Sequence, residues 1–590
     1  MDAGSGAQKA GDILIRTFAK MGKYVYIEPI IPAEISPPVR TRSSMSGVII
    51  RIANFNVTNI GNNTDVILAS HEVVLDRRLD DNEHNPNCIV FLDMSYQKKY
   101  ADDYHKICER AKNLGLEIFP FDISDDAKQL IQSLRSGKNM YYLGILSCIY
   151  NIPEKNIIKE IQSVFKYKLN PDILKTNIKI FKKGYQYAKR NIQFSLNISG
   201  GSKSTKNKVL MDGNSALALG IIDAGIKLFS GYPITPASSI MHLLAKSFSA
   251  YGGVVHQAED EIAAIGGAIG SYFGGVPAIT STSGPGLSLK QEFIGFATMT
   301  EIPLIIINVQ RGGPSTGMPT KTEQSDLSAA IFGSHGDNVK IILSVSNILD
   351  CFYAPQMARY LTEKLHLPVI IMSDFQTANS FNIISKPRIN QIKDISKIPD
   401  FVFELFRIKR LPKNIEMVHN KQSCPGTSDE IRRVTGLNTD ETGSINYFAG
   451  ANQRAHRIRN EKVHHVRRAL TKPEMFGKDK GDILVISWGS TRGALEEAIN
   501  SLRKQNIKAS GLHLRFVYPL PLMMKDIFKN FKKVVTIELT YADEMKPPPL
   551  MILFRSSNLI DVDSITCRAT GRPLRPKTIE YKIKELLNKK

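Results

Sequence analysis

The sequence predicts a multidomain α/β protein whose central part is a doubly wound parallel β-sheet. Between Phe229 and Asp337, apolar segments repeatedly end in loops that are rich in glycine, proline, serine and threonine. Helical and strand patterns alternate along the same region, as they do in parallel sheets that carry helices on both faces. The strands of such sheets present polar residues at their carboxyl ends, so these loops are the expected place for a functional site.

Length and local composition divide the chain into several parts. A chain of 590 residues is too long for one hydrophobic core, and about three or four domains are expected. The clearest boundary is a linker that combines Gly, Ser and Lys and has no core pattern. The predicted parts are a first α/β unit (1–195), the linker (196–208), the alternating unit (209–405), a charged irregular segment (406–480) and a last α/β unit (481–590).

A glycine-rich turn opens the first unit. The segment GSGAQKAG (4–11) leads into a helix whose apolar residues recur at helical spacing as far as Met21. Such a turn can hold an anion on its backbone N–H groups, normally where a strand leads into it. Only three residues precede the turn here, so either that strand is missing or the domain begins with a helix, and the role of the turn stays open. Strands are expected at 24–27, 46–52, 66–69 and 88–92.

Charge and hydropathy restrict the classes of function. The formal net charge of +21 allows nucleic-acid binding, but Lys-rich runs such as 175–191 match no nucleic-acid-binding motif. We therefore expect the positive charge to be spread over solvated faces and tails, where it would speed encounter with an acidic partner. No apolar run approaches the roughly 20 residues that span a bilayer. The start of the chain has no signal or transit pattern, so a cytoplasmic protein without a membrane partner is expected.

The cysteines argue against a metal cluster in this chain. There are six, at positions 88, 108, 148, 351, 424 and 567, and no two form a C-x-x-C pair. Iron–sulfur and structural zinc sites usually use closely spaced thiolates. No metal site is therefore predicted in this chain. If the protein is an enzyme that moves electrons, its iron–sulfur cluster must lie in another polypeptide.

Four motifs in the central region resemble the α subunit of the 2-oxoacid:ferredoxin oxidoreductases. They are GYPITP (231–236), QAEDEIAA (257–264), TSGPG (282–286) and QRGGPSTGMPTKTEQSD (310–326). The 2-oxoglutarate type, with a small γ domain fused in front, is the most similar. The resemblance implies a γ-type α/β domain at the start, then the pyrimidine-binding domain of a thiamine diphosphate enzyme, and a transketolase C-terminal-like domain at the end.

The resemblance also implies a reaction and its partners. Members of the family convert a 2-oxoacid and coenzyme A to acyl-CoA and carbon dioxide, and pass electrons to ferredoxin. Thiamine diphosphate is shared with a β subunit, and Mg²⁺ and a [4Fe-4S] cluster are expected in that β subunit. The chain alone would then be inactive.

One glutamate is expected to activate the cofactor. In enzymes of this class, a carboxyl group hydrogen-bonded to the pyrimidine ring of thiamine diphosphate converts its amino group into the base. Glu261 precedes a helix of small residues (263–270) that would pack closely around it, and a carboxylate walled by apolar surface would exchange a proton near neutral pH. Glu261 is favoured and Glu259 remains the alternative, whereas Asp260 best fits a helix N-terminal carboxylate.

Other site residues follow from the matched motifs. Arg311, directly after an apolar strand, suits bidentate binding of the substrate carboxylate. By resemblance, Thr320 lies near it and Thr235 lies at the substrate carbonyl, although the segment around Thr235 also fits a rigid turn. The remaining cofactor-binding candidates are Tyr232, Pro233, Ser283 and Gly284, with the last two expected mainly to shape a loop.

Three other hypotheses about the function remain open. The same chemistry on pyruvate or on branched-chain oxoacids fits the quoted motifs, although TGMPTKTEQSD (316–326) favours 2-oxoglutarate. A non-catalytic scaffold subunit would keep the fold, and a basic nucleic-acid-binding protein would show steeply salt-dependent binding.

Overall fold

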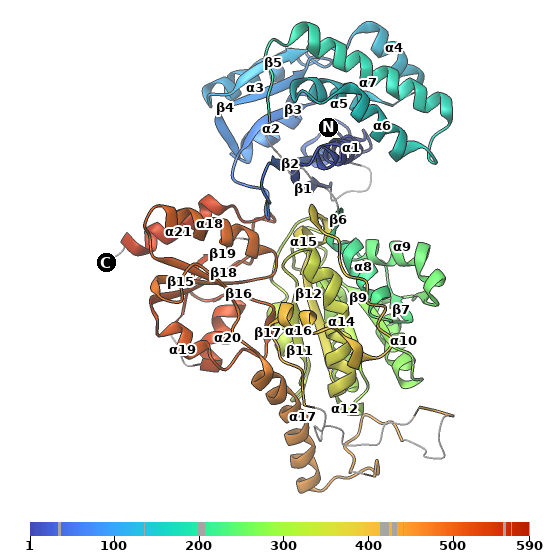
Figure 1. Cartoon of the computed structure of the whole chain (residues 1–590), viewed down its shortest axis with the longest axis vertical. Helices are drawn as coiled ribbons and strands as arrows, with labels where there is room; N and C mark the ends of the chain where they lie inside the picture. The colour runs from blue at the N-terminus through green and yellow to red at the C-terminus, as the bar shows by residue number, and fades with distance from the viewer. Residues whose placement is uncertain are drawn as a thin grey trace. The chain divides into compact units, whose positions relative to one another are not determined.

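The computed structural model describes residues 1–32, 37–134, 136–198, 207–412, 424–426, 433–440, 442–558, 562–567 and 569–588. Most of the linker predicted at 196–208 lies outside these residues, as does most of the stretch 413–432. The chain forms two compact units (Figure 1), of which the first contains Met1–Leu210 and Ser380–Ser385 and the second contains the rest. Each unit has its own sheets and its own core.

The first unit combines two small sheets with a layer of helices. One sheet has the order β2-β1-β13-β6, in which β1 pairs antiparallel with both β2 and β13, and the other is a parallel sheet of order β3-β4-β5. The expected strands of this unit are all present. Its elements are α1 (Ala7–Lys20), β1 (Tyr24–Ile30), β2 (Gly47–Ala53), β3 (Thr64–Ala69), α2 (Glu72–Asp80), β4 (His84–Asp93), α3 (Ala101–Asn113), β5 (Glu117–Phe121), α4 (Asp125–Leu134), α5 (Lys138–Ile149), α6 (Glu154–Phe165), α7 (Pro171–Asn191), β6 (Lys208–Asp212) and β13 (Phe381–Ser385).

The first regular element of this unit is a helix. Before α1 the backbone makes an isolated bridge between Asp2 and Met45. Gly6 has a φ of 79°, and the Asn139 side chain donates a hydrogen bond of 2.9 Å to its carbonyl oxygen. A Cβ at Gly6 would lie 2.5 Å from Asn139 Nδ2, so the glycine is required by this contact within the protein.

The second unit begins with the predicted parallel sheet. Its order is β17-β11-β12-β10-β9-β7-β8, and neighbouring strands are parallel except for β17, which joins β11 antiparallel. The α/β expectation is therefore confirmed, with an antiparallel strand added at one edge. The elements are α8 (Gly213–Asp223), β7 (Leu228–Gly231), α9 (Ser238–Ser247), β8 (Val254–Gln257), α10 (Glu261–Phe273), β9 (Ala278–Thr282), α11 (Gly284–Leu289), α12 (Gln291–Thr300), β10 (Leu304–Gln310), α13 (Leu327–Phe332), β11 (Ile341–Ser344), α14 (Ile348–Leu365), β12 (Pro368–Asp374), α15 (Phe375–Asn379) and α16 (Asp400–Phe406).

The carboxyl-terminal part of the second unit forms another sheet, of order β14-β16-β15-β18-β19. Helix α17 precedes it, and its fully buried Lys462 donates a 2.6 Å hydrogen bond to Glu301. Strand β17 leaves this part to pair with β11, so the two sheets of the unit are joined. The elements are α17 (Ala449–Ala469), β14 (Glu474–Phe476), β15 (Gly481–Trp488), α18 (Arg492–Lys504), β16 (Ala509–Leu514), β17 (Phe516–Tyr518), α19 (Met524–Phe528), β18 (Phe531–Glu538), α20 (Pro549–Asn558), β19 (Asp563–Cys567) and α21 (Pro576–Asn588).

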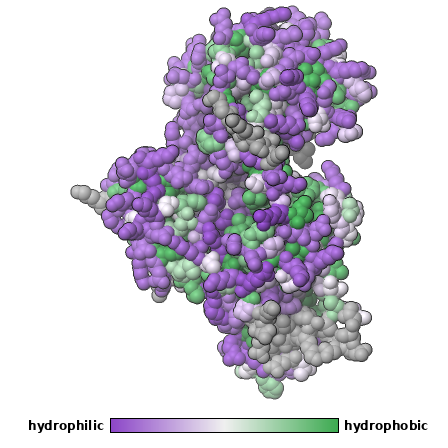
Figure 2. Space-filling model, in the orientation of Figure 1, coloured by the Kyte–Doolittle hydropathy of each residue, from purple (hydrophilic) through white to green (hydrophobic). Residues whose placement is uncertain are grey.

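The surface is mainly polar. On the face drawn in Figure 2, hydrophilic residues predominate and hydrophobic residues gather in small scattered patches. Within the described residues, none of the helices combines the length and the apolar character that crossing a bilayer requires.

The core of the carboxyl-terminal sheet contains an acidic side chain. Glu538 is fully buried; Trp488 Nε1 donates to its Oε1 at 3.2 Å, and the Leu550 backbone N–H lies 3.0 Å from its Oε2. Burial raises the pKa of Glu538 to about 7. The folded state therefore holds this proton more tightly than the unfolded state, in which the pKa is that of an ordinary glutamate.

This linkage predicts a pH dependence of stability. As the pH rises from about 4.5 to about 7, the free energy of unfolding should lose about 3 kcal/mol through Glu538, and Glu538→Gln should abolish that loss. Trp488 is the one tryptophan of the chain, so its fluorescence should titrate with a midpoint near pH 7. A wild-type emission that stays constant between pH 5 and pH 8 would contradict this assignment.

Candidate functional site

The motifs predicted to form the site meet at one edge of the seven-stranded sheet. GYPITP follows β7, QAEDE follows β8, TSGPG follows β9 and QRGG follows β10, and these four strands are neighbours in the order β10-β9-β7-β8. Because the four strands are parallel, their carboxyl ends lie on the same side. Loops up to about 80 residues apart in sequence therefore form one surface.

The three acidic residues between β8 and α10 have different environments. Glu261 is the first residue of α10 and is 8% exposed. Asp260 is the N-cap, and its carboxylate accepts a 2.7 Å hydrogen bond from the Ala263 N–H. Glu259 is exposed. The geometry thus separates the two predicted candidates, since only Glu261 is enclosed.

The enclosure of Glu261 comes mainly from α11 and not from the small residues of α10. Gly286 in α11 lies so close that a Cβ there would be 2.0 Å from Thr282 Oγ1, 2.7 Å from Glu261 Cγ and 3.0 Å from its Oε1. Within α10, Gly267 approaches Ser230, whereas a Cβ at Gly270 would meet nothing within 4 Å. Ala264 and Ala268 are fully buried, whereas Ala263 and Gly270 are exposed, so the expected close packing is found for part of the glycine–alanine series.

This contact predicts the effect of a methyl group at Gly286. Gly286→Ala should lower the free energy of unfolding by about 1–3 kcal/mol, because Thr282 and Glu261 must both shift. As the matched control, Gly270→Ala should raise it by roughly 0.5–1 kcal/mol, because alanine costs less entropy in an open helical position. Thermal unfolding of the two variants measures the difference, and equal midpoints would contradict the packing described.

Arg311 lies at the end of β10, is 7% exposed and reaches the loop after β7. Its Nη1 donates a 2.7 Å hydrogen bond to the Thr235 carbonyl oxygen, while its Nε is buried without a partner among the described residues. Burial lowers the pKa of the Arg311 guanidinium, and the carboxylates of Asp326 and Glu261 act in the opposite direction. One edge of the guanidinium is thus anchored, and Nε on the other edge is available to an anion.

The loop after Arg311 turns back on itself. Gly312 bridges to Met318, and its N–H donates to the Lys321 carbonyl at 3.1 Å. Thr320, which is 7% exposed, is therefore returned to the neighbourhood of Gly312. The residues between, including 313–318, are exposed.

The end of this loop is fixed to the carboxyl-terminal sheet. Gln324 is fully buried; its side-chain amide donates to the Trp488 carbonyl at 2.8 Å and accepts from the Leu539 N–H at 3.0 Å. Gly489, with a φ of 62°, makes room for it, because a Cβ there would lie 2.5 Å from Gln324 Nε2. The carboxyl-terminal domain thus holds the segment that follows Arg311 and Thr320.

Two further polar residues belong to the site and had no predicted role. Asp326 lies against Gly284, where a Cβ would be 2.8 Å from its Oδ1, and Asn308 donates to its Oδ2 at 3.0 Å. Burial raises the pKa of Asp326 to about 6. Lys290, at the end of α11, is fully buried and donates from Nζ to the Glu261 carbonyl oxygen at 2.5 Å. Asp326 closes the last motif in sequence, but nothing in the pattern indicated that it returns to TSGPG.

The remaining predicted residues line the same loops. Tyr232, Pro233 and Thr235 are exposed after β7, whereas the Ser283 side chain is fully buried with its Oγ unpartnered among the described residues. Unpartnered Ser283 Oγ and Arg311 Nε are polar atoms that a ligand can satisfy. With the close approach permitted at Gly284 and Gly286, these residues fit a bound polar ring beside Glu261.

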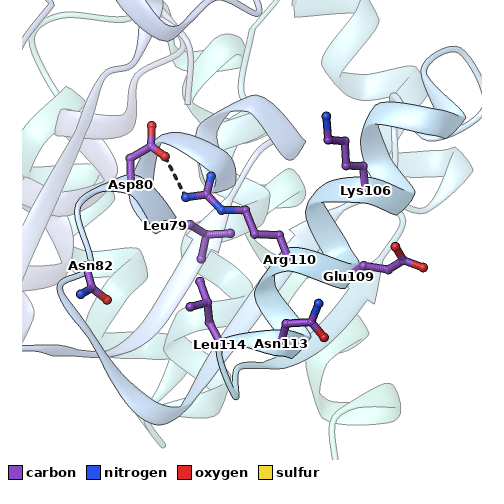
Figure 3. A pocket seen from close by; sticks show the side chains of 8 residues that line it. All are labelled: Leu79, Asp80, Asn82, Lys106, Glu109, Arg110, Asn113 and Leu114. Atoms are coloured by element: carbon purple, nitrogen blue, oxygen red, sulfur yellow. Dashed lines mark hydrogen bonds and ion pairs between the residues drawn. The ribbon is translucent and has the colours of Figure 1, made fainter.

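The first unit has a surface groove of its own. It lies between α2 and α3 and is lined by Leu79, Asp80, Asn82, Lys106, Glu109, Arg110, Asn113 and Leu114 (Figure 3). Arg110 points across it and donates to Asp80 at 2.9 Å. The groove contains none of the residues predicted from the motifs, and its Arg110 and Asp80 side chains pair with one another, so it is assigned no role.

Known proteins resemble this chain in both units. Residues 219–451 match the family described as pyruvate flavodoxin/ferredoxin oxidoreductase, thiamine diphosphate-binding, and residues 2–187 match the family described as pyruvate ferredoxin/flavodoxin oxidoreductase. The 2-oxoglutarate oxidoreductase subunit KorA of Mycobacterium tuberculosis is 31% identical over 96% of this chain and 87% of its own length.

Shorter and structural relatives agree with this match. The 2-oxoglutarate synthase subunit KorA of Methanothermobacter marburgensis is 35% identical over 56% of this chain and 87% of its own length. A solved structure of the 2-oxoglutarate:ferredoxin oxidoreductase from Magnetococcus marinus, with 2-oxoglutarate, coenzyme A and succinyl-CoA bound, superposes with a TM-score of 0.83. That match has 30% identity and covers 99% of this chain and 98% of the other.

Proposed function

Because this chain belongs to the 2-oxoacid:ferredoxin oxidoreductase family, as an α subunit with the γ domain in front, we propose that it oxidises 2-oxoglutarate. The reaction consumes 2-oxoglutarate and coenzyme A, releases succinyl-CoA and carbon dioxide, and passes two electrons to ferredoxin. The observation that carries the proposal is the convergence of enclosed Glu261 and anchored Arg311 at the carboxyl ends of adjacent parallel strands.

Glu261 is the residue that would activate the cofactor. Bound thiamine diphosphate supplies a nucleophilic thiazolium carbon and an electron sink. The Glu261 carboxyl group faces the space beside Gly286 and Thr282, where it can hold or move a proton at the pyrimidine ring nitrogen. Ser283 Oγ and the backbone at Gly284 would contact the same ring, with Tyr232 and Pro233 at the rim.

Arg311 would hold the substrate carboxylate. Its Nη1 is fixed on the Thr235 carbonyl, so the Nε edge can bind a carboxylate side-on through two parallel hydrogen bonds. Low exposure of the guanidinium strengthens that attraction, because little water competes for it. Thr235, whose carbonyl oxygen accepts from Arg311, and Thr320, in the loop that follows Arg311, would contact the substrate carbonyl and its chain.

The site needs a β subunit to be complete. The sequence contains no acidic, Asn-containing loop of the form that holds Mg²⁺ on the cofactor diphosphate, and no closely spaced cysteine pair for a cluster. We assign Mg²⁺ and the [4Fe-4S] cluster to that β subunit. Two apolar side chains next to the site are exposed: Ile262, which follows Glu261 on α10, at 43%, and Leu289 on α11, which precedes Lys290, at 51%. Exposed apolar side chains of this kind suit a contact with the β subunit.

The test is an assay of the purified complex. The chain should be co-expressed with its β subunit, analysed for thiamine, iron and sulfide, and assayed with coenzyme A and a panel of 2-oxoacids. We expect the highest kcat/KM with 2-oxoglutarate and no turnover by this chain alone. A preference for pyruvate or a branched-chain oxoacid would show that the proposed substrate is wrong. A complex that contains no thiamine diphosphate would show that the chain is a non-catalytic scaffold subunit.

A further inference from the structure

A buried lysine is clamped onto the first turn of α10. Lys290 is fully buried, and its Nζ donates to the Glu261 carbonyl oxygen at 2.5 Å. Its own backbone N–H donates to the Gly286 carbonyl at 3.1 Å. The residue therefore connects the backbone of the candidate catalytic glutamate to the glycine that contacts the side chain of that glutamate.

Stability alone does not explain this lysine. A buried ammonium group with a single carbonyl partner is costly, and burial lowers the pKa of Lys290 to about 8, against the opposing effect of Glu261 and Asp260. An apolar side chain of the same length would fill the space without that cost. The lysine is thus a cation held next to Glu261 at the expense of folding.

We propose that Lys290 is a positioning residue for Glu261: its ammonium group, bonded to the Glu261 carbonyl oxygen, holds the first turn of α10 against α11. The proposal rests on the catalytic role proposed for Glu261. The other charges that face this pair are Asp260 at the helix N-cap and Arg311 from the end of β10, with Asp326 acting on Arg311.

The first experiment measures position without activity. Hydrogen exchange of the chain, followed by mass spectrometry on peptides covering 261–269, should be at least tenfold faster in Lys290→Met than in the wild type. The matched control is Lys340→Met. Lys340 is 1% exposed, burial lowers its pKa to about 8 as well, and its Nζ contacts Ser334 Oγ at 3.2 Å, so its removal should leave these peptides unchanged.

The second experiment measures the effect on catalysis in the assembled enzyme. Lys290→Met should lower kcat about tenfold and leave the KM for the oxoacid within about twofold, because Arg311, and not the first turn of α10, is proposed to hold the oxoacid. Lys340→Met should leave both constants unchanged. Lys290→Gln keeps a donor for the Glu261 carbonyl oxygen, so it should recover part of kcat and change exchange less, and it serves if the methionine variant does not fold.

The outcomes separate this proposal from the proposed function. An active complex in which Lys290→Met and Lys290→Gln leave both the exchange rates and kcat unchanged would overturn the positioning role. A wild-type complex that turns over no 2-oxoacid, together with faster exchange in Lys290→Met, would overturn the proposed function and support the structural clamp.

Discussion

Replacing Glu261 with alanine is expected to lower turnover of the assembled enzyme by roughly a hundredfold or more. Glu259→Ala should have a far smaller effect, because the Glu259 side chain is exposed. Glu261 is only 8% exposed and packs against Gly286 and Thr282. The two residues lie two positions apart in sequence, so the pair is a matched comparison of the same substitution in different environments.

Glu261→Gln sharpens this test. Glutamine keeps the size of the side chain and can hydrogen-bond, but it cannot exchange a proton near neutral pH. The loss of turnover should therefore be nearly as large as with alanine, while thermal stability and the thiamine content of the complex stay close to those of the wild type. A larger loss in Glu259→Ala than in Glu261→Ala would show that the other carboxylate activates the cofactor.

Replacing Arg311 with methionine is expected to lower kcat/KM for the oxoacid by about two to three orders of magnitude, mainly through KM. Truncating one partner of a buried charged hydrogen bond costs about 2–5 kcal/mol, and Nε of Arg311 is buried without a partner among the described residues. Arg311→Lys should recover part of the loss, since it restores the charge but not the fork geometry.

Coenzyme A provides the internal control for Arg311. The KM for coenzyme A should change little in either variant, because Arg311 is proposed to hold only the oxoacid. Thermal unfolding must be recorded in parallel, since the substitution also removes the hydrogen bond to the Thr235 carbonyl. Equal losses for the two substrates would point to a disturbed loop after β7 and not to a carboxylate site.

Local patterns predicted much of the fold and of the site. Apolar runs that end in Gly, Pro and Ser indicated β7, β9 and β10, and parallel pairing then brings their loops and the loop after β8 to one edge of the sheet. The identity of the enclosed carboxylate was harder to predict, because Glu259 and Glu261 share the same segment. Their difference arises from α11, which begins 23 positions after Glu261 and closes over Glu261 alone.

Features that depend on distant pairing were not predicted. Strand β13 (Phe381–Ser385) belongs to the first unit because it pairs with β1, more than 350 positions earlier, and no local pattern encodes that partner. Strand β17 similarly leaves its own part of the chain to extend the central sheet. The local pattern around Lys290 shows only a charged residue between two short helices. Its burial follows from the approach of α10, which no local pattern indicates.

The docking of Gln324 has a consequence for exchanging parts between related enzymes. The segment that follows Arg311 is held by backbone groups at positions 488 and 539, which lie far along the chain. A chimera in which only the carboxyl-terminal domain is exchanged would therefore pair Gln324 with backbone positions from another protein, and these contacts would not match. A functional recombinant, made in the laboratory or in evolution, has to exchange residues 320–326 together with the segments around positions 488 and 539.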